Sequence, residues 1–173
     1  MGFILSLLIE TCYTLANNKI KDLYIRQLSL SDIKDMVRIE EKCFLERFRF
    51  NEPILVSLVT RAAHGTSYAA VSEGNLVGFI IGNIVHDVGR IAEIVTVQVE
   101  PALHRNHIGQ RLLLYLETEL RKYYEINTIM LQVYYRNKGA ISFYEANGYL
   151  LEKKIRNYYG KKDHALLMKK LLT

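Results

Sequence analysis

The segment 99–113, VEPALHRNHIGQRLL, combines a strand end, a basic loop and the start of a helix. The first backbone N–H groups of a helix have no partner within the helix and carry a partial positive charge, so they suit a phosphate group. Arg105 and Arg111 add side-chain donors, and Gly109 lets a ligand approach the backbone closely. The segment is a candidate phosphate-binding loop. On these local features alone an ordinary strand-to-helix connection is favoured, because one glycine is weak evidence.

The elements around this loop follow from hydrophobic periodicity and turn signals. Leucines recur every four residues along 107–124, and Ser29 to Asp32 resembles a capping box. Further turn signals are Glu73-Gly74-Asn75 and Asp87-Val88-Gly89, and Gly148 follows a helix end. We expect strands at 23–27, 67–72, 76–85, 90–99, 128–135, 149–159 and 164–172, and helices after Asp32 and at 54–63, 107–124 and 138–147. This order predicts an α+β fold with one mixed, mostly antiparallel seven-stranded sheet and about four flanking helices.

The composition is that of one globular domain, with 173 residues, 50% hydrophobic and 24% charged. The net charge of +5 is uneven. Residues 1–100 hold 10 Lys and Arg against 12 Asp and Glu (net −2), and residues 101–173 hold 13 against 6 (net +7). A solvated basic surface and attraction of a polyanion, either a phosphorylated cofactor or the ribosome, both explain this asymmetry.

The amino-terminal segment 1–22 is apolar, but it is short for a membrane span and lacks the basic start of a secretory signal. We expect a helical extension, followed by the main domain over 23–173. A start upstream of the native one and a weak myristoylation pattern at Gly2 are the alternatives. Two cysteines, Cys12 and Cys43, suggest neither a disulfide framework nor a metal site, which favours a reducing, cytoplasmic setting without membrane attachment.

Two motifs resemble the GCN5-related N-acetyltransferase (GNAT) superfamily over roughly residues 23–173. The first loop is similar to V-x-P-x-[YF]-[QR]-x-x-G-x-[GA], with Val99, Pro101 and Gly109 matching. Leu103, His104 and His107 replace the aromatic, the Gln/Arg and the first Gly. The second segment, LQVYYRNKGAISFYEANGY, is similar to L-x-V-x-x-x-N-x-x-A-x-x-[FL]-Y-x-x-x-G-[FY] in every defined position.

The ends of the domain narrow this resemblance to protein N-terminal acetyltransferases, including the archaeal and ribosomal-protein-alanine types. IRNYYGKKDHALLM resembles their R-x-Y-Y…[ED]-x-A-x-x-M ending, and CFLERF resembles their first loop, usually L-P-E-N-Y. The resemblance implies acetyl-CoA as cosubstrate, with no metal. It implies cofactor contacts from the backbone of the strand end, from the loop and from the second motif: Val97, Gln98, Val99, His104, Arg105, Asn106, His107, Ile108, Gly109, Gln110, Asn137 and Tyr144.

The reaction needs a free amine, stabilisation of an oxyanion and a proton for the departing thiolate. The resemblance places Tyr144 near the CoA sulfur as general acid, and a core aromatic is the alternative. It places Gln132 where relatives often carry Glu or His, and Gln cannot accept a proton. Glu93 stands where related archaeal enzymes carry a His, so we predict Glu93 as the base, directly or through an ordered water. A salt-bridged strand carboxylate is the alternative. Strand alternation predicts that residues 93, 95, 97 and 99 share one face.

The acceptor side is predicted from the first loop and from the tyrosines near the end of the chain. The resemblance places Glu46 and Phe48 in a substrate loop, with Tyr158 and Tyr159 as walls of a peptide groove. We predict acetylation of protein or peptide N-termini by direct attack in a ternary complex, with ribosome association and no specific nucleic acid as further expectations. A lysine side chain or a small amine is the alternative acceptor. A pocket closed by residues 45–53 would favour a small amine, and an open groove flanked by Glu46 and Tyr158 would favour a peptide. A weakly catalytic CoA-binding or ribosome-associated adaptor is the remaining alternative.

Overall fold

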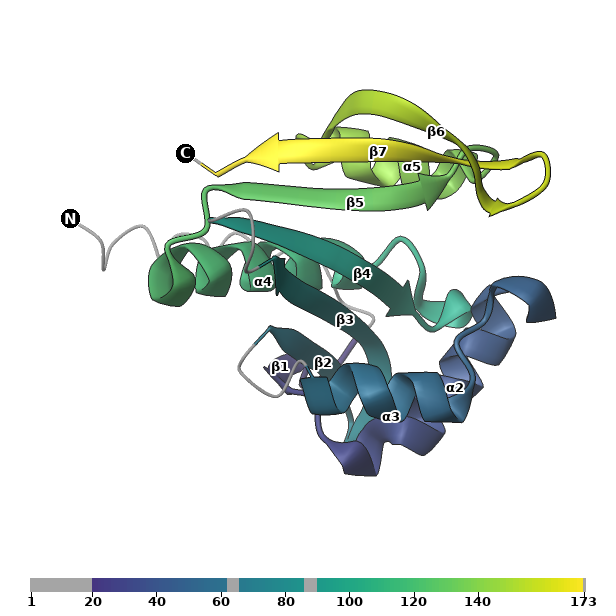
Figure 1. Cartoon of the computed structure of the whole chain (residues 1–173). Coiled ribbons are helices and arrows are strands. Elements are labelled where there is room, and N and C mark those ends of the chain that lie inside the picture. Colours follow the sequence, from purple (N-terminus) through teal and green to yellow (C-terminus); the bar gives the residue numbers. More distant parts are fainter. Residues whose placement is uncertain (1–19, 62–65, 86–89, 173) are drawn as a thin grey trace.

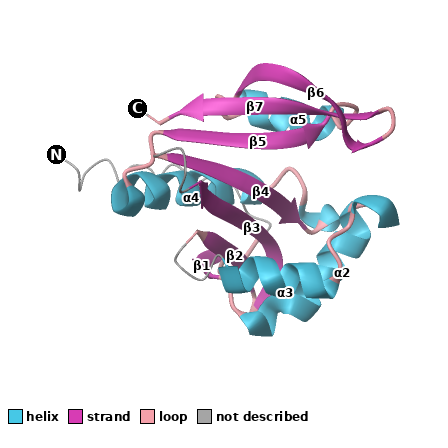
Figure 2. Ribbon diagram, viewed as in Figure 1, coloured by secondary structure: helices cyan, strands magenta, loops and turns pink. Residues whose placement is uncertain are grey.

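The computed structural model describes residues 20–61, 66–85 and 90–172. Seven strands form one sheet in the order β1-β2-β3-β4-β5-β7-β6, and all neighbours are antiparallel except β4 and β5 (Figures 1 and 2). The predicted α+β fold is therefore confirmed. The strands are β1 (Tyr24–Gln27), β2 (Ser67–Ser72), β3 (Asn75–Val85), β4 (Ile91–Val99), β5 (Thr128–Tyr134), β6 (Leu150–Gly160) and β7 (Asp163–Leu171).

Helices cover both faces of the sheet and divide the core into two clusters (Figure 1). Helices α4 (Ile108–Tyr124) and α5 (Lys138–Ala146) pack on one face, and α2 (Ile33–Cys43) and α3 (Glu52–Arg61) pack on the other. The apolar stripe predicted for α4 is buried. Burial of each such side chain stabilises the fold by about 1.5–3 kcal/mol. Gly82 permits the close approach of α4, since a Cβ there would lie 2.9 Å from the Thr66 carbonyl oxygen and 3.2 Å from Leu116.

The local turn signals are confirmed where the structure describes them. Glu73 and Gly74 have φ of 50° and 78°, as a tight hairpin turn requires, and Gly148 has φ of 85° after α5. Asp32 Oδ2 accepts a hydrogen bond from the Ser29 backbone N–H at 2.9 Å before α2 begins. The predicted turn at 87–89 and the predicted helical extension up to residue 19 lie outside the described residues.

The parallel pair of β4 and β5 opens part-way along its length. Ile91 to Ile94 pair with Thr128 to Leu131, and the two strands then diverge (Figure 1). Pairing with β5 ends at Ile94, five residues before β4 ends at Val99. Residues 95–99 of β4 consequently have no strand partner on the β5 side.

A β-bulge in β4 changes which residues share a face. Ile81 pairs with Thr96 and the next residue, Gly82, pairs with Ile94, so Val95 is an extra residue. Ile94 and Val97 both belong to the α4 side of the core, whereas Val95 packs on the α2 side. The prediction that residues 93, 95, 97 and 99 share one face is therefore wrong. The extra residue reverses the alternation, which turns Glu93 to the α2 side and Val97 and Val99 to the α4 side.

Candidate functional site

The loop between β4 and α4 forms a backbone cradle in spite of its departures from a glycine-rich pattern. Arg105 and His107 adopt φ of 65° and 58°, so both non-glycine residues occupy the left-handed region. The first helical bond runs from the Arg111 N–H to the His107 carbonyl at 2.9 Å. The backbone N–H groups of Ile108, Gly109 and Gln110 precede that bond and remain available for an anion.

Polar side chains of the loop brace its backbone. The Nε2 of His104 lies 2.9 Å from the Val99 carbonyl oxygen, and the Asn106 amide donates to the Leu103 carbonyl at 3.0 Å. The Nδ1 of His107 lies 3.0 Å from Oε1 of Gln110. These contacts leave the exposed Arg105 as the loop's cationic side chain. The phosphate donors are therefore mainly backbone groups, and the histidines fix the loop's shape.

The open edge of β4 presents backbone groups to the gap between β4 and β5. Because the Glu100 N–H donates to the Val77 carbonyl at 2.8 Å, antiparallel alternation turns the backbone groups of Val97 and Val99 away from β3. Gln98, between them, is paired with Phe79 of β3, and its buried amide donates to Thr96 Oγ1 at 3.0 Å. Val97 and Val99 are thus placed to bind an extended ligand arm, whereas Gln98 faces β3.

Two residues of the second motif lie at α5: Asn137 before its first turn and Tyr144 in the apolar cluster that also includes Val97 and Val99. Asn137 caps α5, and its Oδ1 accepts from the Ala140 N–H at 3.1 Å. Tyr144 is buried between Phe143 and Tyr149, with ring centroids 5.2 and 5.7 Å away. Burial raises the pKa of the Tyr144 phenol, and the nearby Tyr159 raises that pKa further. The phenol therefore keeps its proton at neutral pH, as a general acid must.

Gln132 organises the opposite side of the gap. Its side-chain Oε1 accepts from the Tyr158 hydroxyl at 3.3 Å, and its carbonyl accepts from the Tyr159 hydroxyl at 3.1 Å. Burial raises the pKa of Tyr159 to about 12, and Tyr158 and Glu93 add to the shift. Burial raises the pKa of Tyr158 as well, and Glu93 adds a smaller increase. The structure thus gathers Glu93, Gln132 and both tyrosines in one place.

Phe48 closes this group from the loop that follows α2. Its ring centroid lies 5.0 Å from that of Tyr134 and 5.9 Å from that of Tyr159. The Tyr134 hydroxyl donates to Asp163 Oδ1 at 2.9 Å, and Asp163 lies 4.0 Å from the Arg47 guanidinium. The sequence reasoning missed Tyr134 and Asp163. Alternation along β5 could have found Tyr134, because Gln132 and Tyr134 stand two residues apart on one face.

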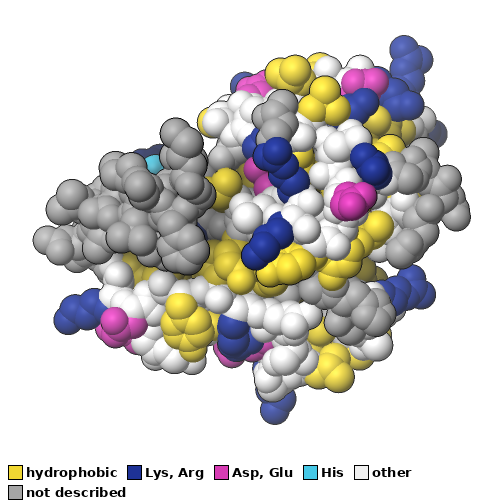
Figure 3. Space-filling view, turned by 90° about the vertical axis from the view of Figure 1, so that its left-hand side faces the viewer, with side chains coloured by type: hydrophobic (Ala, Val, Ile, Leu, Met, Phe, Trp, Pro, Cys, Tyr) yellow, Lys and Arg dark blue, Asp and Glu magenta, His cyan; other side chains and the backbone are white. Residues whose placement is uncertain are grey.

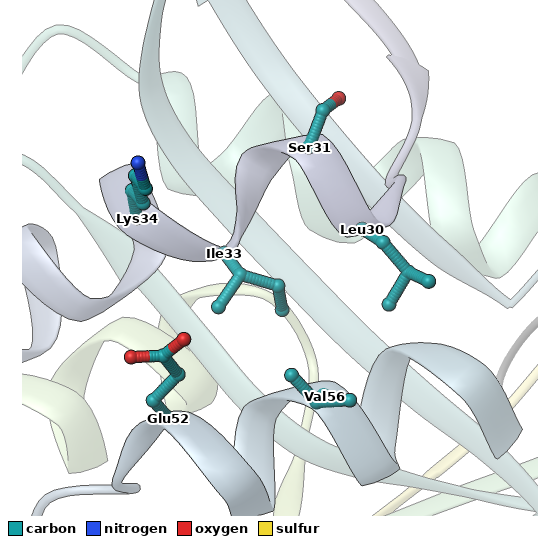
Figure 4. A pocket seen from close by; sticks show the side chains of 6 residues that line it. All are labelled: Leu30, Ser31, Ile33, Lys34, Glu52 and Val56. Carbon is teal, nitrogen blue, oxygen red and sulfur yellow. The ribbon is translucent and has the colours of Figure 1, made fainter.

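Glu46 lies at the rim. It begins the short 3-10 turn Glu46–Phe48 and is exposed, as is Tyr158 at 49%. A separate hollow of about 470 Å³ lies between α2 and α3 (Figure 4). Its lining is Leu30, Ser31, Ile33, Lys34, Glu52 and Val56, and it shares no residue with the predicted site.

The described residues hold neither a metal-binding cluster nor a membrane-spanning helix. Among them, no group of three or more His, Cys, Asp or Glu could hold a metal ion. No helix within 20–61, 66–85 or 90–172 is long and apolar enough to cross a membrane. On the face drawn in Figure 3, the visible Lys and Arg are dispersed around a band of hydrophobic side chains.

This arrangement suits transfer of an acyl group from a phosphorylated thioester. Backbone N–H groups at the start of α4 fit a pyrophosphate, and the open edge of β4 fits an amide-containing arm. The protonated phenol of Tyr144 belongs to the same apolar cluster as Val97 and Val99 of β4. Glu93, Gln132 and the two tyrosines gather on the opposite face of the sheet. The site therefore defines an acyltransferase.

Comparison with known proteins supports this class. The sequence model of the Acetyltransferase (GNAT) family matches residues 33–149. Ard1 from Thermoplasma volcanium is 24% identical, with a TM-score of 0.79 over 87% of this chain and 98% of that one. The ribosomal-protein-S18-alanine N-acetyltransferase from Escherichia coli is also 24% identical, with a TM-score of 0.74 over 87% and 94%. No curated protein sequence matches the chain.

A third structural relative was solved with the cofactor. The PaiA N-acetyltransferase from Thermoplasma acidophilum, in complex with coenzyme A, is 24% identical, with a TM-score of 0.70 over 87% and 99%. The family match spans more than half of the sequence, so the chain belongs to the Acetyltransferase (GNAT) family. It is an acetyl-CoA-dependent N-acetyltransferase, as the sequence predicted.

Proposed function

We propose that the enzyme transfers the acetyl group of acetyl-CoA to the α-amino group of protein N-termini. The observation that carries the proposal is the Gln132 group, in which two tyrosine hydroxyls and a neutral amide meet beside Glu93. Neutral hydrogen-bonding groups with aromatic walls suit a peptide backbone. An α-amine has a pKa near 7.7–8.0 against about 10.4 for lysine, so it needs little help from a base.

The residues take the following roles in a ternary complex. Glu93 accepts the proton of the amine, directly or through water, while the amine nitrogen attacks the thioester carbonyl. A backbone N–H at the open edge of β4, at Val97 or Val99, stabilises the oxyanion that forms. When the carbon–sulfur bond breaks, Tyr144 protonates the departing thiolate. Asn137 and the cradle from His104 to Gln110 hold the cofactor, and Glu46 meets the acceptor at the rim.

A small amine or lysine is the second candidate acceptor. The packing of Phe48 on Tyr134 and Tyr159 favours it, because these contacts narrow the acceptor side. The spermidine N-acetyltransferase SpeG from Vibrio cholerae shares the fold, with 17% identity and a TM-score of 0.69. The exposed Glu46 and Tyr158 favour the open groove that a peptide needs.

We propose action in the cytoplasm, with ribosome association supported by the net +7 of residues 101–173. The adaptor alternative rests on His107 and Gln132, which replace expected family residues. The structure weakens the first argument, since His107 still forms the left-handed turn of the cradle.

Release of free thiol from acetyl-CoA tests the proposal. The acceptors are peptides that start with Ser, Ala or Met-Leu and an N-blocked peptide with an internal lysine. Turnover only with free N-termini is expected, and the ranking would give the sequence preference. Turnover on the blocked peptide would instead identify a lysine acetyltransferase. No turnover on any peptide, with acetyl-CoA still bound, would reject peptide substrates and leave a small amine as the acceptor.

A further inference from the structure

Glu40 is a buried carboxyl group whose position the catalytic roles do not explain. Only 1% of its surface is exposed, and it lies on the last turns of α2. Its Oε2 accepts a hydrogen bond from the Phe50 backbone N–H at 3.2 Å. Its Oε1 has no hydrogen-bond partner among the described residues. A methionine would fill such a site at lower cost, so the carboxyl group calls for a reason.

The partner of Glu40 lies in the loop 44–51 that carries the acceptor residues. This loop leaves α2 at Phe44, reaches Glu46 and Phe48 at its tip, and returns past Phe50 to α3. At the tip, Phe48 packs on Tyr134 and Tyr159. At the base, the hydrogen bond from the Phe50 N–H to Glu40 fixes the returning part of the loop to α2. The base thus determines where the tip can lie.

Arg49 makes a second connection at the base. Its Nε donates to the Phe44 carbonyl at 2.7 Å, and its Nη2 donates to the Glu41 carbonyl at 2.9 Å. These carbonyls belong to the end of α2 and the residue after it, where backbone acceptors lack helical partners. The Arg49 charge also favours the ionised form of Glu40, lowering a pKa that burial raises. Two side chains, one from each side, therefore clamp the loop.

We propose that Glu40, together with Arg49, is a positioning residue that fixes the loop 44–51 and thereby shapes the acceptor site. The inference rests on the proposed use of this loop for the acceptor. Neither side chain touches the reacting atoms, so loss of the clamp should weaken acceptor binding and leave cofactor binding intact. Trypsin cleaves after Arg47 and Arg49, so the rate of tryptic cleavage in the loop measures how firmly the loop is held.

The test compares Glu40→Met with Glu41→Met, since Glu41 is the exposed neighbour on the same helix. In Glu40→Met, tryptic cleavage after Arg47 and Arg49 should rise about tenfold, roughly the factor that one hydrogen bond supplies. The KM for the peptide acceptor should rise about fivefold to tenfold on the same ground, with the KM for acetyl-CoA unchanged. Glu40→Gln keeps an acceptor for the Phe50 N–H. Its tryptic cleavage rate and its KM for the peptide should therefore stay close to the wild-type values.

Cleavage in Glu40→Met that stays within about twofold of Glu41→Met would overturn the clamp. Faster cleavage with an unchanged acceptor KM would overturn its role in the acceptor site. The cleavage assay needs no acceptor, so it decides the clamp even if the enzyme acetylates no peptide and the proposed function fails. If Glu40→Met does not fold, Arg49→Ala should raise cleavage after Arg47 by itself, and an unchanged rate would reject the proposal.

Discussion

The two faces of the sheet are built differently. On the α4 and α5 face, a continuous apolar cluster surrounds Tyr144 and supports the cofactor cradle. On the α2 and α3 face, the site lies among hydrogen-bonded tyrosines, Gln132 and carboxylates. The first face departs from the family motifs at Leu103, His104 and His107 but keeps a left-handed turn at His107, whereas the second departs from them at Gln132. The donor face, on the α4 and α5 side, therefore depends on backbone geometry, and the acceptor face, on the α2 and α3 side, depends on individual side chains.

The largest expected effect concerns the acceptor face. Glu93→Gln should lower kcat about 10³-fold, because general base catalysis typically contributes 10²–10⁴-fold and Gln cannot take a proton. The Kd for acetyl-CoA should stay unchanged. Steady-state kinetics and calorimetry would measure the two quantities, with the exposed Glu152→Gln on β6 as control. A normal rate in Glu93→Gln would remove Glu93 from the role of base.

The corresponding change on the donor face is Tyr144→Phe. It should lower kcat about 10²-fold, since the thiolate would leave without its proton donor while the buried ring is kept. Because burial raises the pKa of Tyr144, no alkaline fall in rate from this phenol is expected between pH 7 and 9. A pH–rate profile of the wild type and Tyr144→Phe would check both statements. Equal rates in the two proteins would assign Tyr144 to the core alone.

Sequence reasoning predicted the donor face well. The motif from Leu131 to Tyr149 and the leucines of α4 define elements whose bounds the structure confirms within about two residues. The bulge at Val95 escaped prediction, because both registers place β-branched residues on an apolar face. Tyr134, Asp163 and the clamp at Glu40 also escaped, since they depend on contacts between segments far apart in the chain.

A buried network supports the donor face. Glu117 on α4 accepts hydrogen bonds from the Tyr149 hydroxyl at 2.9 Å and from Lys170 Nζ at 2.6 Å. Glu117→Leu should lower the free energy of unfolding by about 2–3 kcal/mol, below the range for fully buried pairs because Lys170 is partly exposed. Urea unfolding would measure it, with the exposed Glu145→Leu on α5 as control. A loss under about 0.5 kcal/mol would mean that the network contributes little.

The acceptor face should instead gain stability when its buried carboxyl group is neutralised. Burial raises the pKa of Glu40 from 4.5 to about 7, even though Arg49 and the Phe50 N–H lower it. The neutral form is favoured in the folded state, so Glu40 stabilises the fold below pH 4.5 and this contribution is lost as the pH rises through 7.

Glu40→Gln should therefore become more stable than the wild type between pH 4.5 and 7, by an amount on the order of 1–3 kcal/mol. The difference should then stay constant to pH 8. Urea unfolding at pH 5, 6, 7 and 8 would trace the change, with Glu41→Gln as the matched control. The thiol of Cys43 on the same helix is also coupled to Glu40, but burial raises its pKa to about 11, outside this window. A stability difference between Glu40→Gln and the wild type that does not change with pH would contradict the raised pKa of Glu40.

The smallest effect tests the cradle itself. His107 has φ of 58°, a conformation that costs a non-glycine residue roughly 1–2 kcal/mol. His107→Gly relieves this cost, but the greater entropy of the unfolded chain with glycine destabilises the fold by about 0.5–1 kcal/mol. The free energy of unfolding should therefore rise by up to about 1 kcal/mol. Gly148→Ala is the opposite experiment, since φ is 85° there, and it should destabilise the protein. Because the N–H groups of the cradle belong to the backbone, acetyl-CoA should bind His107→Gly at least as tightly as the wild type. Weaker binding would show that the imidazole ring contacts the cofactor and that side chains contribute to the donor face as well.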